Sequence, residues 1–307
     1  MAGNGDIFSK SVFDLGRVVL ASSRYKPQAH PVTKDFAQKL QERGIDTVLD
    51  LEGTAKLSQV AKGADMVIAV GGDGTILSSA RRMAGTPVPT LGINMGKLGF
   101  LAEHSIEDAY AFLDGDKQGC WRLSPKMMLE IRLHNSVGST TCYALNDVTV
   151  SQGIMTRLLG INMSVDGYHA TQYHADGLII STPVGSTAYS LSVGGPILGQ
   201  GLRALMVTPI APHSLTNRPI VIESLCTISF RIDNPADEMA LVVDGQERLE
   251  LHGGDYFTVS AAKTDFMLIA SDKHSSFDIL RQKLGWGTTP SGRKQDAPKA
   301  QSAQSEG

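Results

Sequence analysis

An unbroken apolar run followed at once by glycines is the feature that most constrains the fold of this chain. Residues 66–70 are Met, Val, Ile, Ala and Val, and Gly71-Gly72-Asp73-Gly74-Thr75 comes next. A continuous Val/Ile stretch bounded by glycines is typical of a strand that is buried on both faces of a parallel sheet. Residues 76–84 then have a helical pattern, which ends at Gly85. The sequence therefore predicts a strand, a glycine-rich loop and a helix in succession.

This loop has the features of a phosphate site, with Gly71, Gly72, Gly74 and Thr75 as the expected phosphate-donor loop. Free backbone N–H groups and the helix dipole favour phosphate at such a junction, and glycine allows close approach. Asp73 would repel phosphate, so we interpret it as facing a hydroxyl to be deprotonated or a divalent cation. The alternative is a plain glycine turn. The loop lacks the lysine of a Walker motif and the G-x-G-x-x-G spacing of a dinucleotide fold, so it is a different phosphate-binding device.

Length and charge restrict the class of protein further. A chain of 307 residues predicts about two domains. A net charge of -3 excludes the basic surface that draws nucleic acid or anionic membranes nonspecifically, so we expect small-molecule partners, no nucleic acid and no membrane. Cys120, Cys142 and Cys226 are odd in number and far apart, which fits neither a disulfide framework nor a metal site. Together with the lack of a leader-like or membrane-spanning apolar run, this predicts a cytoplasmic protein.

Strand and helix patterns alternate in the first part of the chain. Strands are predicted at residues 17–21, 46–51, 66–70 and 88–93, and helices at residues 32–43, 76–84 and 106–113. This alternation predicts an α/β domain with a parallel sheet that is covered on both faces. Ligands of such sheets bind at the carboxyl ends of the strands, which is where the glycine loop lies.

From about Leu123 the apolar residues alternate with polar ones, as half-buried antiparallel strands require. Asp166-Gly167 and Asp244-Gly245 each lie between two such runs and predict hairpin turns. The second part of the chain is therefore predicted to be an all-β domain. A further helix is predicted at residues 277–284.

Several further segments, in this order along the chain, resemble the NAD kinase family. They are residues 144–148 (Ala-Leu-Asn-Asp-Val), 175–183, 185–192, 194–197, 209–219, 244–246 (Asp-Gly-Gln) and 283–286. The resemblance covers essentially everything from Met66 to Trp286. The glycine loop is shared with diacylglycerol and sphingosine kinases and has a relative in phosphofructokinases, whereas the long block at residues 176–189 singles out NAD kinases.

The resemblance implies a bacterial-type ATP-NAD kinase, which transfers the γ-phosphoryl group of ATP to the 2′-hydroxyl of the adenosine ribose of NAD and makes NADP. It implies Mg²⁺ or a similar divalent cation, ATP as donor, and a homo-oligomer, either a dimer or a tetramer. Residues 1–122 would form an α/β donor-phosphate domain like that of phosphofructokinases and diacylglycerol kinases, completed by a helix at residues 275–286. Residues 123–274 would form an all-β NAD-binding domain. The polar composition of residues 287–307 predicts a disordered tail.

The resemblance also implies roles for particular residues. Asp73 would be the catalytic base; Asn146 and Asp147 would hold the adenosine half of NAD, although many relatives have Glu at the second position. Asp176 would face the nicotinamide carboxamide. His174 stands where relatives often have Arg, and Arg157, from the same or from a neighbouring subunit, could supply that charge. The NAD site expected in full is Asp73, Gly74, Asn146, Asp147, Arg157, His174, Asp176, Thr187, Ala188, Tyr189, Ser190, Leu191, Ser192 and Gln246.

Two alternatives stay open on the sequence alone. A lipid kinase of the diacylglycerol-kinase type would share the glycine loop, although no apolar or basic docking face stands out. A non-catalytic dinucleotide-binding sensor would not need Asp73. Asn94, Lys97 and His213 are interpreted as structural or solvated rather than catalytic.

Overall fold

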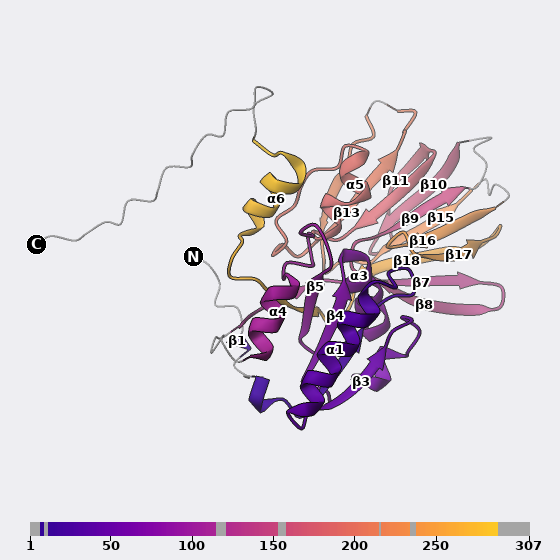
Figure 1. Ribbon diagram of the computed structural model, residues 1–307. Helices are drawn as coiled ribbons and strands as arrows, with labels where there is room; N and C mark the ends of the chain where they lie inside the picture. Colours follow the sequence, from indigo (N-terminus) through magenta and orange to yellow (C-terminus); the bar gives the residue numbers. More distant parts are fainter. Residues whose placement is uncertain are drawn as a thin grey trace, which may run out of the picture. The chain divides into compact units, whose positions relative to one another are not determined.

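The computed structural model describes residues 7–8, 12–114, 121–152, 158–214, 216–233 and 238–287 (Figure 1). The chain divides into two compact units, Met1–Ser271 and Asp272–Gly307, and each is described by itself. Among the described residues no helix is long and apolar enough to cross a membrane. Arg157, the thiol of Cys120 and the tail from residue 288 lie outside the described residues.

A mixed sheet organises the amino-terminal half of the first unit. Its strand order is β1-β6-β19-β5-β4-β2-β3. Strands β3, β2, β4, β5 and β19 run parallel to one another, while β6 pairs antiparallel with β19, and β1 with β6. The strands are β1 (Ile7–Phe8), β2 (Arg17–Ala21), β3 (Asp46–Asp50), β4 (Met66–Gly71), β5 (Thr90–Asn94), β6 (Trp121–Lys126) and β19 (Phe266–Ala270).

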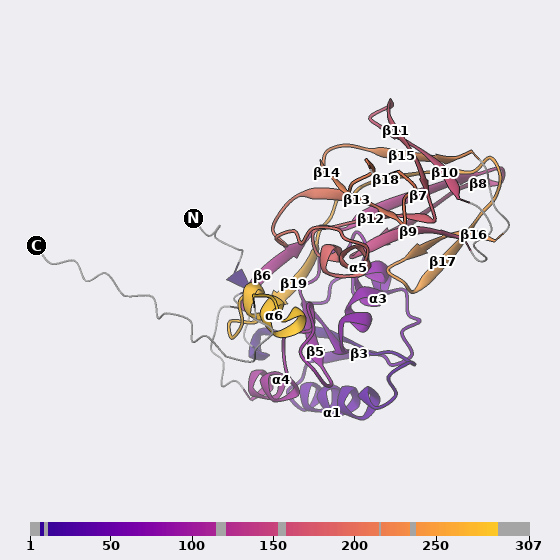
Figure 2. The same ribbon diagram turned by 90° about the horizontal axis from the view of Figure 1, so that it is seen from above.

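Helices cover both faces of this sheet, as the unbroken apolar strands predict. Helices α1 (Ala29–Glu42) and α4 (Ile106–Leu113) pack with Val18 and Leu20 of β2, on one face. Helices α2 (Leu57–Val60) and α3 (Asp73–Met83) pack with Val19 and Ala21, on the other. Figure 2 shows α1 and α4 on one side of β5 and α3 on the other. Since successive strand residues point to opposite faces, β2 contributes to both cores.

Two antiparallel sheets form the second half of the first unit. One has the order β11-β10-β15-β18-β7-β8, and the other has the order β14-β13-β12-β9-β16-β17. The first sheet contains β7 (Leu129–Asn135), β8 (Gly138–Ala144), β10 (Leu159–Val165), β11 (Tyr168–Ala175), β15 (Ile228–Ile232) and β18 (Tyr256–Ala261). The second contains β9 (Asp147–Gln152), β12 (Gly177–Ser181), β13 (Ala204–Ile210), β14 (Ile220–Glu223), β16 (Met239–Val243) and β17 (Glu247–Leu251). The predicted fold class, α/β followed by all-β, is confirmed.

The alternating apolar residues of these strands make one shared core. Leu129, Ile131 and Leu133 from β7 pack in the same buried cluster as Val148 and Val150 from β9. Both predicted hairpin turns are present, β10 to β11 at Asp166-Gly167 and β16 to β17 at Asp244-Gly245. All four turn residues have positive φ, between 48° and 85°, as type I′ turns require. The aspartates therefore tolerate a backbone conformation that most residues avoid.

Some element boundaries differ from the sequence-based prediction. Helix α3 begins at Asp73 rather than at residue 76, and α1 begins at Ala29 rather than at residue 32. Glycine is a poor helix former, and Gly74 lies in the first turn of α3, so the sequence pattern placed the start of the helix too late. Strands β6 and β19 lie at the two ends of the range 123–274 predicted for the β domain, yet they pair in the first sheet. The domain limits themselves stay a prediction.

The second unit contains α6 (Ser276–Leu284), close to the predicted residues 277–284. Ser275 and Asp278 form a reciprocal capping box at its start, and Gly285 ends it in the left-handed conformation. The rings of Phe277 and Trp286 stack with their centroids 6.2 Å apart. Sequence signals at both ends thus define this helix.

Candidate active site

The glycine loop joins the end of β4 to the first turn of α3, as predicted. Gly71 and Gly72 have φ values of 156° and 153°. A Cβ atom at Gly71 would overlap the Thr75 side chain, and one at Gly72 would lie 2.8 Å from Lys26 Nζ. Gly71 therefore requires glycine for conformation and for space, and Gly72 requires it for conformation. The four predicted donor-loop residues, Gly71, Gly72, Gly74 and Thr75, lie together at the carboxyl edge of the sheet.

Asp73 holds the loop that follows β5. Its Oδ2 accepts a hydrogen bond from Phe100 N at 2.8 Å, and its Oδ1 accepts from Leu101 N at 3.0 Å and Ala102 N at 2.9 Å. A carboxylate offers about four acceptor positions, so three N–H donors leave one of them, on Oδ2, available to a ligand. Asp73 as a whole is half-buried.

Lys26 is a residue of this loop that the sequence analysis missed. It lies between β2 and α1, and its Nζ donates a hydrogen bond to Gly71 O at 2.8 Å. It places a positive charge beside a phosphate-type loop that has no lysine of its own. The signal that could have found it is its position just after a strand of the same parallel sheet, because such segments meet at one edge.

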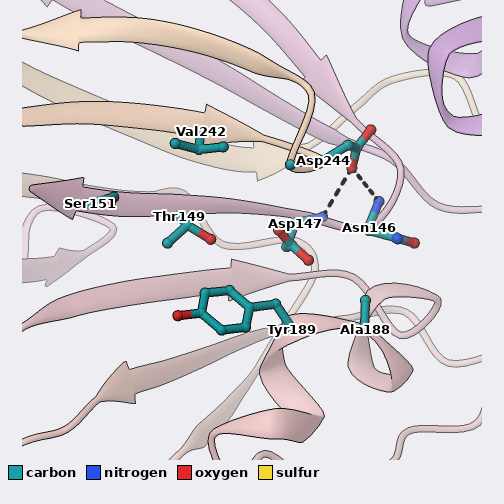
Figure 3. A pocket seen from close by; sticks show the side chains of 9 residues that line it. Asn146, Asp147, Thr149, Ser151, Ala188, Tyr189, Val242 and Asp244 are labelled. Carbon is teal, nitrogen blue, oxygen red and sulfur yellow. Dashed lines mark hydrogen bonds between the residues drawn. The ribbon is translucent and has the colours of Figure 1, made fainter. Parts of the chain in front are cut away.

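Asn146 and Asp147 line a cavity of about 350 Å³ beside β9 and β16 (Figure 3). The side chains of Ala188 and Tyr189 lie across the cavity from Asp147. The remaining lining residues are Thr149, Ser151, Val242, Asp244 and Gly245. The predicted adenosine-binding pair therefore opens into a hollow with carboxylate, amide, hydroxyl and aromatic groups, which suits a nucleoside.

The protonation of Asp147 is set by its surroundings. Asp147 is only 5% exposed. Burial and, second, the charge of nearby Asp244 raise the pKa of the Asp147 carboxyl to about 7. Near neutral pH this group can thus either donate or accept a hydrogen bond, as a ribose hydroxyl can.

Asp244 is the second residue that the sequence analysis missed, since it was interpreted only as a turn residue. Its carboxylate accepts hydrogen bonds from the backbone N–H groups of Leu145 (3.2 Å), Asn146 (2.7 Å) and Asp147 (3.2 Å). It also accepts one from Arg81 Nη1 at 2.8 Å. Burial raises the pKa of Asp244, while Arg81 and the backbone donors oppose that shift. The hairpin turn therefore fixes the main chain of the predicted adenosine-binding pair.

Gln246 connects the cavity to the donor loop. Its Oε1 accepts a hydrogen bond from Arg81 Nη2 at 2.7 Å, and its Nε2 donates to Gly74 O at 3.1 Å. Gly245, the residue before it, lines the cavity. The side chain of Gln246 thus spans the distance between the donor loop and the turn that lines the cavity.

The segment from Thr187 to Ser192 reaches the cavity with two of its residues. Ala188 and Tyr189 line it. Thr187 Oγ1 donates to Val184 O at 3.1 Å, and the fully buried Ser190 hydroxyl shares a hydrogen bond with Thr208 Oγ1 at 2.8 Å. Leu191 is half-buried and Ser192 is exposed. The hydroxyls of Thr187 and Ser190 are therefore used in holding this segment in place.

His174 and Asp176 lie away from this cavity. Asp176 directly precedes β12, and Ser181 at the far end of β12 pairs with Asp147. Five residues of strand place Asp176 roughly 17 Å along the sheet from that pair. His174 is exposed, and its carbonyl accepts a hydrogen bond from His213 N at 3.0 Å. Within one chain these two residues therefore lie at the opposite end of β12 from the cavity.

Two further features of the site region concern Asn94 and the arrangement of possible metal ligands. Asn94 Oδ1 accepts from Gly96 N at 2.9 Å, and its Nδ2 donates to Lys97 O, so it shapes its own loop. In the part of the chain that the structure describes, no group of three or more His, Cys, Asp or Glu side chains gathers as a metal site would.

Family models and individual relatives with similar sequences all point to one protein family. The family model described as the ATP-NAD kinase N-terminal domain matches residues 17–116, and that described as the ATP-NAD kinase C-terminal domain matches residues 145–271. The NAD kinase of Geotalea daltonii is 35% identical over 280 residues, which cover 88% of this chain and 99% of that protein. The NAD kinase of Syntrophotalea carbinolica is 38% identical over 271 residues, covering 85% of this chain and 95% of that one.

Solved structures agree on the fold. Yeast NADH kinase complexed with NADH superimposes with a TM-score of 0.79 at 23% identity, covering 96% of this chain and 95% of that chain. An NAD kinase from Archaeoglobus fulgidus in complex with ATP gives a TM-score of 0.67 at 23% identity, covering 88% and 97%. Because both domain models match and relatives align along most of their length at 35 to 38% identity, this chain belongs to the NAD kinase family.

Proposed function

We propose that this chain is an ATP-dependent NAD kinase that phosphorylates the 2′-hydroxyl of the adenosine ribose of NAD. The observation that carries the proposal is the bridge through Gln246, which joins the carbonyl of Gly74 in the donor loop to the turn that lines the Asp147 cavity. A phosphoryl donor on the loop and a nucleoside in the cavity would therefore be held next to each other. Family membership supports the same reaction.

Asp73 is proposed as the base. The free acceptor position on Oδ2 would take the proton of the ribose 2′-hydroxyl as its oxygen attacks the γ-phosphorus. The new bond joins the ribose oxygen to phosphorus, the bond from the γ-phosphorus to its bridging oxygen breaks, and ADP leaves with that oxygen. Positioning and charge neutralisation dominate such transfers. Lys26 Nζ and the N–H groups at the start of α3 would supply the charge.

The dinucleotide is proposed to bind with its adenosine in the cavity of Asn146, Asp147 and Tyr189. Asp147 and the Asn146 amide would hold ribose hydroxyls and the edge of the base, while the Tyr189 ring offers a flat apolar face. Tyr189 is 46% exposed, so its ring is accessible to a ligand. Asp176, His174 and Arg157 are proposed for the nicotinamide half.

The substrate complex is proposed to carry Mg²⁺ on ATP, and the protein to form a homo-oligomer in the cytoplasm. Among the described strands β14 lies at the edge of its sheet and exposes Ile220 and Val221, at 43% and 46%, and apolar side chains at a strand edge favour self-association. The half-buried free thiols of Cys142 and Cys226 are compatible with a reducing compartment.

The test incubates the purified protein with MgATP and NAD and measures NADP with an NADP-specific dehydrogenase. We expect NADP and ADP in equal amounts. Parallel reactions with NADH or with polyphosphate in place of ATP define the preferred acceptor and donor. No NADP from NAD with either donor, and no NADPH from NADH, made by protein with a normal melting curve, would reject the proposal.

A further inference from the structure

We propose that Arg81 is a positioning residue that holds the donor loop and the NAD cavity in register through two separate branches of hydrogen bonds. This inference rests on the proposed function, because it assigns the phosphoryl donor to one branch and the dinucleotide to the other. Arg81 lies in α3, about two turns after Asp73, so one rigid helix carries both residues.

Each of the three nitrogens of the Arg81 guanidinium takes part in a hydrogen bond. Its side chain is 5% exposed, and its three nitrogens donate to three different residues: Nη1 to Asp244 (2.8 Å), Nη2 to Gln246 (2.7 Å) and Nε to Glu247 (3.1 Å). A planar guanidinium has donors in a fixed fork, so the position of one acceptor determines where the others must lie. Lysine has a single flexible donor group and cannot replace this geometry.

The first branch leads to the dinucleotide. The side chain of Asp244 has no exposed surface, and its Oδ1 accepts hydrogen bonds from the backbone N–H groups of Asn146 and Asp147. Arg81 therefore holds these two residues through Asp244. A buried carboxylate is stable in its charged form only with such donors around it. Arg81 thus sets the place from which Asn146 and Asp147 face the cavity.

The second branch leads to the phosphoryl donor. Since Gln246 Oε1 accepts from Arg81, its Nε2 is turned toward Gly74 O. An amide has its donor and acceptor on opposite sides, so Arg81 determines which of them faces the loop. Glu247 is half exposed, places a second carboxylate against the guanidinium, and belongs to neither branch.

The test compares Arg81→Lys with Arg82→Lys. Arg82 is the next residue of the same helix and pairs with buried Asp50 at 2.5 Å, at a place that contacts neither branch. Both substitutions keep the positive charge and remove the guanidinium from an ion pair with a buried aspartate. The two variants are therefore matched in the interaction that each of them loses. We expect Arg81→Lys to lower kcat/KM for NAD at least about tenfold, with raised KM for both NAD and ATP, and Arg82→Lys to stay within about twofold of wild type.

A double-mutant cycle tests the branching. Gln246→Leu breaks only the second branch, so its effect on KM for ATP should not add to that of Arg81→Lys: the double variant should match Arg81→Lys within about twofold. Additive effects of Arg81→Lys and Gln246→Leu on KM for ATP would overturn the coupling. Equal kinetics in the Arg81 and Arg82 variants would also overturn it, as would an Arg81→Lys variant with a lowered melting temperature but unchanged KM values. A wild-type protein that makes no NADP would instead reject the proposed function.

Discussion

Asp73 combines two tasks at the residue scale, because it anchors residues 100–102 and is the proposed base. We expect Asp73→Asn to lower turnover at least about a hundredfold, the usual scale for a general base, while NAD binding is retained. The measurement is steady-state turnover together with calorimetric titration of NAD. An Asn variant with turnover near wild type would exclude Asp73 as the base.

Asp147 gives a prediction about which substrate it serves. Asp147→Ala should weaken NAD binding by about ten- to a hundredfold, since the loss of a pair of hydrogen bonds costs roughly 1.5 to 3 kcal/mol. ATP binding should change little, because Asp147 lies in the cavity rather than in the donor loop. Titrations of each ligand separately decide this. If both affinities fall equally, or neither falls, Asp147 does not belong to the dinucleotide side.

The raised pKa of Asp147 predicts a dependence of stability on pH. In the folded protein this pKa is about 7, against 3.8 for an ordinary Asp, so folding favours the protonated form and loses stability as pH rises from about 4 to above 7. Asp147→Asn removes that loss. The quantity to compare is the melting temperature of the variant minus that of the wild type, measured without ligands. We expect this difference to be larger at pH 8.5 than at pH 5 by at least about 3 °C. The same difference at both pH values would contradict the pKa shift.

The residues that sequence reasoning found and those that it missed differ in a physical way. Asp73 and Asp147 lie inside local motifs. Lys26 and its partner Gly71 are 45 residues apart, and Arg81 and Asp244 are 163 apart. No local pattern reports such a pair, because only the folded chain brings its members together. The hydrogen bond between the Ser190 and Thr208 hydroxyls could not be predicted for the same reason, since Thr208 is on another strand.

At the scale of elements, the loop after β5 depends on a glycine. A Cβ atom at Gly99 would overlap the carboxylate of Asp73, whereas one at Gly96, in the same loop, would have nothing within 4 Å. Gly99→Ala should therefore displace Asp73 and lower turnover at least about tenfold, as misplacing a catalytic group by about 1 Å does. Gly96→Ala is the control, with near-wild-type turnover. Equal turnover in the two variants would show that the loop does not position Asp73.

Element types were easier to predict than element limits. The apolar runs and the Asp-Gly turns predicted the strands and hairpins, because period and turn chemistry are local properties. The first turn of α3 was missed, because Gly74 has low helix propensity and the packing of Ile76 and Ala80 stabilises the helix instead. The site depends on that turn, since it places Asp73 on a helix rather than on a free loop.

At the scale of the whole molecule, the tail gives a simple prediction. The sequence of residues 288–307 has no large apolar side chain. Removing it should leave both the melting temperature and the turnover unchanged, because it has nothing to bury. A thermal melt and an NADP assay on the shortened chain measure this, with the full chain as reference. A clear loss of melting temperature would mean that these residues contribute to the folded state.

Strands β6 and β19 have a consequence for how this architecture can vary. Lys126 and Phe266 are paired neighbours in the first sheet, so the chain leaves that sheet and returns to it at adjoining points. A segment whose two ends lie side by side can be lengthened, shortened or exchanged by recombination while the host sheet keeps its strand order. Residues 127–265 are a segment of this kind, because they begin and end at neighbouring positions of the first sheet.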